Sequence, residues 1–292
     1  MSTKVASRAK SVVLRPRART SPTWWRRLGS LVLPSYTHLV MLWLFAPIIV
    51  MVIYGFNDTH GRLNIVWSGF TLKWFRDPFG VTALTTAVYT SLVTATIGAI
   101  ISTVLGTMIA LASHRYSFRG KALLDAVMVM NIAASEVVMG AALVTLFVAS
   151  SIPLGILTIV LAQVMFSIPF VAITVRARLV GFDSSLEEAA QDLGASPLTT
   201  FRLVTLPLIF PGVLAAALLA FALCLDDYVI TSFVSGNTQT FPLWVYGATR
   251  LGVPPQVNVI GTFIFLAGGL MAISFATVRS WRNRRLARES AL

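Results

Sequence analysis

The chain has 292 residues, of which 56% are hydrophobic and only 12% are charged, and its mean hydropathy is +0.80. A soluble domain carries about twice that share of charged residues, so these values indicate an integral membrane protein. One cysteine and three histidines exclude a disulfide scaffold and give no reason to expect a metal or redox cofactor. The net charge of +12 comes from arginines that crowd the ends and certain loops, which is typical of membrane orientation rather than of nucleic-acid binding.

The first 35 residues carry eight Lys/Arg and no acidic residue. No small-residue cleavage site follows the first apolar run, so we expect a basic tail and a retained membrane anchor. Trp24, Trp25, Arg26 and Arg27, followed by leucines at 28, 31 and 33, fit a short helix in the inner membrane interface. A disordered tail that only enforces topology is an equal alternative for residues 1–20.

Six apolar runs are long enough to cross a bilayer, because a span needs about 20 mostly apolar residues. The sequence therefore predicts an all-α membrane protein with six transmembrane helices. The runs are 39–56, 83–112, 122–149, 154–175, 208–228 and 257–278. The segment 233–249 is apolar but interrupted by Gly236, Asn237 and Pro242, which favours a folded outer loop or a partial re-entrant turn.

The basic residues predict that both termini are cytoplasmic. With this orientation 19 of the 23 Lys/Arg residues lie inside, as expected for loops that are retained in the cytoplasm. Only Arg62, Lys73, Arg76 and Arg250 lie outside. The expected organisation is a basic tail (1–35), a membrane domain (36–280) with a cytoplasmic loop at about 177–207, and a second basic tail (281–292).

Three acidic residues lie deep in the apolar runs. Glu136 is about 14 residues into the third run and hence near the middle of the membrane, while Asp226 and Asp227 fall in the outer part of the fifth. A charged residue at the bilayer centre costs about 2.5–3.5 kcal/mol, so each should face an aqueous cavity or a partner. The sequence therefore predicts a cation pathway, to which Tyr228 and Trp244 add aromatic faces for an ammonium group.

Each of these residues has a second interpretation. Glu136 fits an interhelical hydrogen bond or a pair with a neighbouring subunit, and the aspartates fit a helix cap or a loop clamp. Adjacent residues on a helix point about 100° apart, so only one aspartate should face the cavity squarely, and its more outward position favours Asp227. Rings at this depth more commonly anchor a protein in the membrane interface.

The cytoplasmic loop contains two predicted short helices. Ser184 and Glu187 have the spacing of a capping box at the start of the first. An apolar stripe follows, on a helix too short to be stable alone, so it needs a partner surface. The stripe consists of Leu186, Ala189, Ala190 and Leu193.

The end of the first helix and the start of the second are also marked. Gly194 suits a left-handed C-terminal cap, and Ser196 and Pro197 suit the N-cap and first residue of the second helix. We expect Pro207 and Pro211 to end the second helix and to begin the fifth span.

No catalytic motif is present in the sequence. The G-x-x-x-x-G-K-[ST] loop that cradles phosphates in ATPases is missing, and its nearest fragment, at 119–122, lacks the first glycine and the hydroxyl. No serine lies in a G-x-S-x-G turn and no histidine in an H-E-x-x-H pair. We therefore expect that this chain is not an enzyme and binds no cofactor.

The loop at 177–207 resembles the EAA motif of ABC importer permeases. The matching positions are Glu188, Ala189, Ala190, Gly194, Leu206 and Pro207, with Val204 where isoleucine is commoner. In that family the first helix of the motif is a coupling helix that docks into a cleft of the cytoplasmic ATPase. The resemblance implies that these residues, together with Glu187, couple the chain to ATP hydrolysis on a partner.

Residues 40–278 are further similar to the second permease subunit of spermidine/putrescine importers, in the phrases LFAPIIVMVIYGFND, LEEAAQDLGASP, LCLDDYVITSFVSG and TFPLWVYGATRLGVPPQVN. This resemblance implies the type I importer fold in a bacterial inner membrane, with polyamines as cargo. It also implies a second and distinct permease, two ATP-binding cassette subunits and an extracytoplasmic binding protein. Two alternatives stay open: another cationic amine, opine or amino-acid derivative as cargo, or a proton-coupled secondary transporter.

Overall fold

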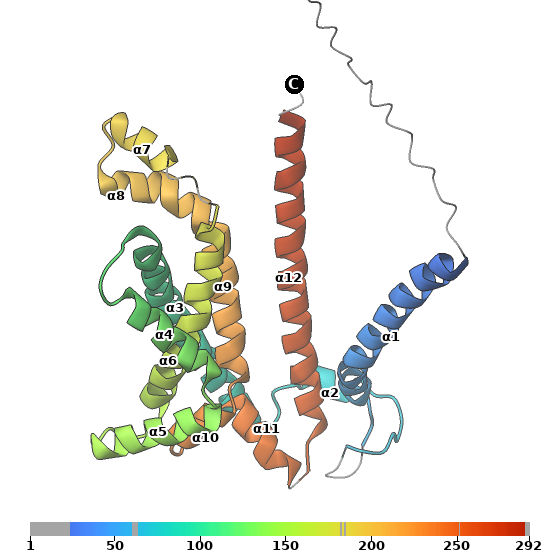
Figure 1. The fold of residues 1–292 in the computed structure, drawn as a ribbon. Helices are drawn as coiled ribbons and strands as arrows, with labels where there is room; N and C mark the ends of the chain where they lie inside the picture. Colours follow the sequence, from blue (N-terminus) through green and yellow to red (C-terminus); the bar gives the residue numbers. More distant parts are fainter. Residues whose placement is uncertain (1–23, 60–63, 182, 184, 251, 290–292) are drawn as a thin grey trace, which may run out of the picture. The chain divides into compact units, whose positions relative to one another are not determined.

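The structure is a computed structural model that describes residues 24–59, 64–181, 183, 185–250 and 252–289. The described chain is built of helices joined by loops (Figure 1). It divides into two compact units, residues 1–51 and 52–292. The all-α architecture predicted from the sequence is confirmed.

α1 (Trp24–Tyr54) forms the described part of the first unit and ends inside the second. Its segment Pro34–Tyr54 is long and apolar enough to cross a membrane. The residues expected to form a separate interfacial helix are helical, but they continue into this span without a break. Pro34 lies inside the helix, and transmembrane helices tolerate proline because local adjustments satisfy the freed backbone groups.

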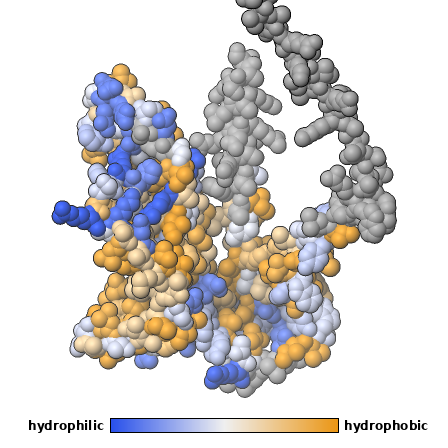
Figure 2. Space-filling view, viewed as in Figure 1, coloured by the Kyte–Doolittle hydropathy of each residue, from blue (hydrophilic) through white to orange (hydrophobic). Residues whose placement is uncertain are grey.

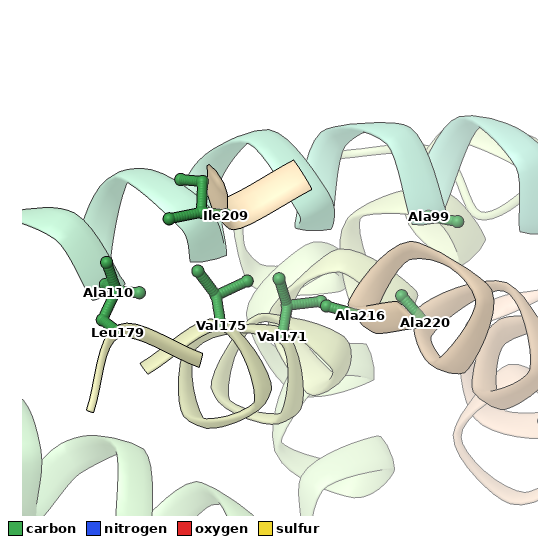
Figure 3. Packing of buried hydrophobic residues seen from close by; sticks show 8 residues of the cluster. All are labelled: Ala99, Ala110, Val171, Val175, Leu179, Ile209, Ala216 and Ala220. Carbon is green, nitrogen blue, oxygen red and sulfur yellow. The ribbon is translucent and has the colours of Figure 1, made fainter. Parts of the chain in front are cut away.

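Three long helices form the core of the second unit: α3 (Thr82–Arg115), α6 (Ile156–Leu179) and α9 (Leu206–Asp226). Figure 3 shows their contact, made largely by small and β-branched side chains: Ala99, Ala110, Val171, Val175, Leu179, Ile209, Ala216 and Ala220. Small residues allow membrane helices to approach closely. At Gly106 of α3 an added Cβ would lie 2.6 Å from the Cγ1 atom of Val171, so this packing requires glycine.

The third apolar run is not one straight span. It forms α4 (Lys121–Ala133) and α5 (Glu136–Ala149), which meet at a bend of 109°. Ala134 and Ser135 between them have extended backbones. The bend lets α5 pack against α10 (Val229–Val234), and at Gly140 a Cβ would lie 2.5 Å from the ring of Phe233. Tertiary packing therefore overrides the continuous apolar pattern.

The remaining helices lie mainly in the last third of the chain. α10 ends before a turn at Gly236, and α11 (Phe241–Thr249) follows, so the segment 233–249 is folded as expected. α12 (Pro255–Glu289) is apolar over Pro255–Met271, and its first turns pack with α3 and α11 around Leu84. α2 (Lys73–Arg76) is a single turn in the segment between α1 and α3.

The expected count of six spans is not exactly confirmed. Among the described residues four helices have the length and composition of a span, or five when the bent pair α4 and α5 counts as one. α12 adds only the shorter apolar segment. The sequence pattern located the apolar runs correctly, but it could not show that the third one bends.

Gly106→Ala tests the close approach of α3 and α6. We expect the melting temperature of the detergent-solubilised subunit to fall by several degrees, because overpacking costs about 1–3 kcal/mol and each kcal/mol corresponds to about 2–4 °C. Gly268→Ala on α12 is the control, since beyond its own helix backbone no atom of the described residues lies within 4 Å of its added Cβ. Equal melting temperatures of the two variants would contradict this account of the core.

Candidate functional site

Hydrophilic side chains gather over α7, α8 and the loop between α3 and α4 (Figure 2). Hydrophobic side chains dominate the lower part of the same group of helices in this view. α7 (Ser185–Asp192) is the first helix of the EAA-like loop. It ends as predicted, because Gly194 has a φ of +87° and Ala195 N–H donates to the carbonyl of Ala190 at 3.1 Å. Ser184, and with it the predicted capping box, lies outside the described residues.

The second helix of the loop begins as predicted but does not end as predicted. Ser196 caps α8 (Pro197–Thr200) by accepting from the N–H of Thr199 at 3.3 Å. The chain then makes a π-helical turn, η1 (Phe201–Thr205), and continues directly into α9. Pro207 does not break the helix, because it stands in the first turn of α9, where a missing N–H costs least.

The apolar stripe of the first helix is exposed in the described chain except at Ala190, which is half-buried. The exposed fractions of Leu186 and Leu193 are 48% and 90%, and Ala189 is exposed as well. Glu188, the acidic residue of the motif, is also exposed. The stripe and Glu188 are therefore free to meet another chain.

Glu187 has a different environment from its neighbour. Its carboxylate accepts hydrogen bonds from the guanidinium of Arg115 and from the hydroxyl of Thr205. Partial burial raises the pKa of Glu187, but the hydrogen bonds from Arg115 and Thr205 and the charge of Arg115 outweigh burial, so the pKa lies below its usual value. The sequence did not predict that Arg115 and Thr205 bind Glu187. Arg115 entered the sequence analysis only as one of the basic residues that indicate the orientation, and Thr205 did not enter it.

A second group of predicted residues lines a cavity of about 600 Å³ between α5, α6, α9 and α10. Its lining includes Glu136, Asp226, Asp227 and Tyr228, together with Phe166. Glu136 is the first residue of α5 rather than a residue in the middle of a straight helix, because the third run bends just before it. The structure thus brings three predicted acids together.

The two aspartates of this cavity have separate roles. Asp227 caps α10: its carboxylate accepts from the backbone N–H of Ile230 at 3.1 Å, and from the N–H and hydroxyl of Thr231 at 3.2 and 2.7 Å. Asp226 is exposed. Both aspartates line the cavity, but the oxygens of Asp227 are occupied by the start of α10, so the expectation that Asp227 faces the cavity more squarely stays a prediction.

The break between α9 and α10 is supported from α6. Gln163 has an exposed fraction of 2% and donates from Nε2 to the carbonyl of Cys224 at 2.9 Å. This satisfies a carbonyl at the end of α9, where the helix no longer supplies a donor. A single glutamine in an apolar run gives no sequence signal for such a role.

The predicted aromatic residues do not share one site. The ring of Tyr228 lies 4.7 Å from that of Tyr246, which is in turn 5.7 Å from the guanidinium of Arg250. Trp244 lines a different cavity of about 620 Å³, together with Trp74 and residues of α11 and the start of α12. Tyr228 is therefore part of the acidic cavity and Trp244 is not.

Comparison with known proteins identifies the class. Residues 102–290 match the family described as "Binding-protein-dependent transport system inner membrane component". The chain belongs to this family and is a transmembrane permease subunit of a binding-protein-dependent importer, a multi-pass protein of the inner membrane. This membership contradicts the alternative of a proton-coupled secondary transporter.

Two relatives are similar over most of the chain. The chain is 36% identical to the "Spermidine/putrescine transport system permease protein PotC" of Escherichia coli (strain K12) over 85% of its length and 93% of the relative. It is 39% identical to the "Putrescine transport system permease protein PotI" of the same strain, over 78% of this chain and 83% of the relative.

A solved structure supports the fold. A bacterial ABC transporter involved in the import of the acidic polysaccharide alginate contains a chain that is 17% identical, with a TM-score of 0.63, over 89% of this chain and 98% of that one. The similarity is one of fold, the type I importer permease fold expected from the sequence.

Asp227→Ala tests the capping role. Loss of an N-cap costs about 0.5–2 kcal/mol, so the melting temperature of the purified subunit should fall measurably. Asp226→Ala removes the adjacent, exposed acid and should leave the melting temperature unchanged. If the melting temperature fell for Asp226→Ala and stayed unchanged for Asp227→Ala, the cap would have been assigned to the wrong residue.

Proposed function

We propose that this permease subunit carries polyamines, such as spermidine and putrescine, across the inner membrane in an ATP-driven importer. The observation that carries the proposal is the acidic cavity at the end of α9, where Glu136 and Asp226 are both exposed. The names of the relatives, which concern spermidine and putrescine, support it.

The chemistry of the cavity suits a cation with two or more ammonium groups. Carboxylates in a narrow, lower-dielectric space replace part of the hydration that such a cation loses. Exposed acids at membrane depth are costly in lipid, so the face that carries Glu136 and Asp226 should be covered in the assembly. A second permease subunit that completes the cavity there supplies this cover.

The assembly that we propose contains a distinct second permease, two ATP-binding cassette subunits that bind the ATP, and an extracytoplasmic binding protein. In this proposal the chain itself binds no cofactor. The uncovered stripe of α7 supports docking to an ATPase subunit. The motif residues assigned to coupling are Glu188, Ala189, Ala190, Gly194, Leu206 and Pro207.

The orientation proposed from the basic residues places both termini in the cytoplasm. The ion pair between Arg115 and Glu187 supports this orientation. It joins the loop after α3 to the loop that contains α7, so both loops lie at the same end of the helices. Both loops are rich in basic residues, as cytoplasmic loops are.

The cargo proposal predicts the effect of neutralising the two exposed acids. In vesicles reconstituted with all partners, Glu136→Gln and Asp226→Asn should each lower spermidine uptake by about five-fold or more, since each keeps size and hydrogen bonding but loses attraction for ammonium groups. The affinity of the binding protein for spermidine should not change, because that site lies in another chain.

The control for uptake is Asp125→Asn, which removes a charge that pairs with Arg176 at 2.8 Å and does not line the cavity. Its uptake should match that of the unmodified chain. Undiminished uptake in both cavity variants would eliminate the acidic pathway and favour a cargo without positive charge.

Cysteine labelling tests the orientation. In a Cys224→Ala background, single cysteines at Ser117 and Thr199 should resist a membrane-impermeant thiol reagent in intact cells, and one at Asn237 should react. All three native side chains are exposed, so a difference in labelling reports the side of the membrane. The opposite pattern would reverse the proposed topology.

A further inference from the structure

Glu187 is the acidic residue of α7 that turns toward its own chain. The exposed fraction of its side chain is 12%, whereas Leu186 before it on α7 is 48% exposed and Leu193, directly after the end of α7, is 90% exposed. The family resemblance groups Glu187 with the ATPase-facing residues of the motif. Its contacts with Arg115 and Thr205 instead turn it toward its own chain.

The carboxylate of Glu187 joins three elements. It binds Arg115, the last residue of α3, and Thr205, the last residue of η1. Thr205 has an exposed fraction of 1%, so its hydroxyl is directed into the protein. The contacts keep the carboxylate charged near neutral pH, because the pKa of Glu187 lies below its usual value.

Among the described residues, the other connections of α7 are local. α7 has only eight residues, too few for an isolated helix to be stable. Its C-terminal turn at Gly194 is open, since beyond its chain neighbours no atom of the described residues lies within 4 Å of an added Cβ. The four residues of α8 and the π-helical turn follow, and π-helical turns are uncommon and tend to occur at functional sites.

We propose that Glu187 is a positioning residue that sets the angle of α7 against α3 and η1, so that a displacement of α7 reaches α9. It acts on its own chain and leaves contact with the ATPase to Glu188 and the apolar stripe. α9 runs from the π-helical turn to Asp226, about 30 Å at 1.5 Å per residue, so the connection ends at the acidic cavity. This inference rests on the proposed function.

The experiment is a double-mutant cycle in the reconstituted transporter. Glu187→Gln and Arg115→Gln should each reduce stimulation of ATP hydrolysis by spermidine-loaded binding protein by about five-fold or more, at the lower end of typical coupling between sites. The double variant should be no worse than the worse single variant, because both remove the same interaction. Thr205→Val should reduce stimulation too, and Thr205→Ser, which keeps the hydroxyl, should restore it.

Two measurements separate positioning from direct contact and from misfolding. The ATPase should co-purify with every variant in unchanged amount, since α7 keeps its exposed surface. Asp125→Asn is the matched control, because it removes the ion pair between α4 and α6 and should leave stimulation unchanged.

Other outcomes would overturn the inference. Glu187→Gln could abolish stimulation of ATP hydrolysis, or stop the ATPase from co-purifying, while Arg115→Gln behaved like the unmodified chain. In that case Glu187 would contact the ATPase directly. Additive losses in the double variant, or normal stimulation in all variants, would also refute it. If the unmodified transporter neither responded to spermidine-loaded binding protein nor took up spermidine, the proposed function itself would fail.

Discussion

The end of α9 depends on two side chains that satisfy backbone groups at a break in the helix. Gln163 donates to the carbonyl of Cys224, and Asp227 accepts from two N–H groups in the first turn of α10. In the membrane interior an unsatisfied backbone group costs several kcal/mol, so irregular backbone persists only where protein or water supplies partners. Because these partners come from the same chain, the helix ends at a defined residue. Asp226 is thereby placed at the wall of the acidic cavity.

The other end of α9 is secured in a related way. A charged side chain from a neighbouring segment, Glu187, binds Thr205 at the junction with the π-helical turn, and Arg115 balances its charge. Between these two ends α9 packs against α3 and α6 through small side chains, which leaves little room for it to bend. A displacement at the cytoplasmic loop should therefore move α9 as a unit.

The sequence predicted those parts of the fold that depend on local chemistry. The turn at Gly194 and the cap at Ser196 follow from the conformational preferences of one or two residues, and both are confirmed. The bend before Glu136 was missed, because it depends on packing between α5 and α10, whose residues are far apart in the sequence. The passage of η1 into α9 at Pro207 was missed because a proline in a first helical turn looks the same in a sequence as one that ends a helix.

The sequence predicted which acidic residues belong to the candidate sites, but not which of them bind groups of their own chain. The two pairs of adjacent acids, at 187–188 and 226–227, show why. The exposed members, Glu188 and Asp226, face outward, while Glu187 and Asp227 bind groups of their own chain. Successive residues on a helix point about 100° apart, so two neighbouring carboxylates cannot serve one surface equally. Which member turns inward depends on donors supplied from elsewhere, namely Arg115 and Thr205 for the first pair and the N-terminus of α10 for the second. The inward acid holds the backbone in place, and for that reason the outward acid has a fixed position from which to meet a partner subunit or a cation.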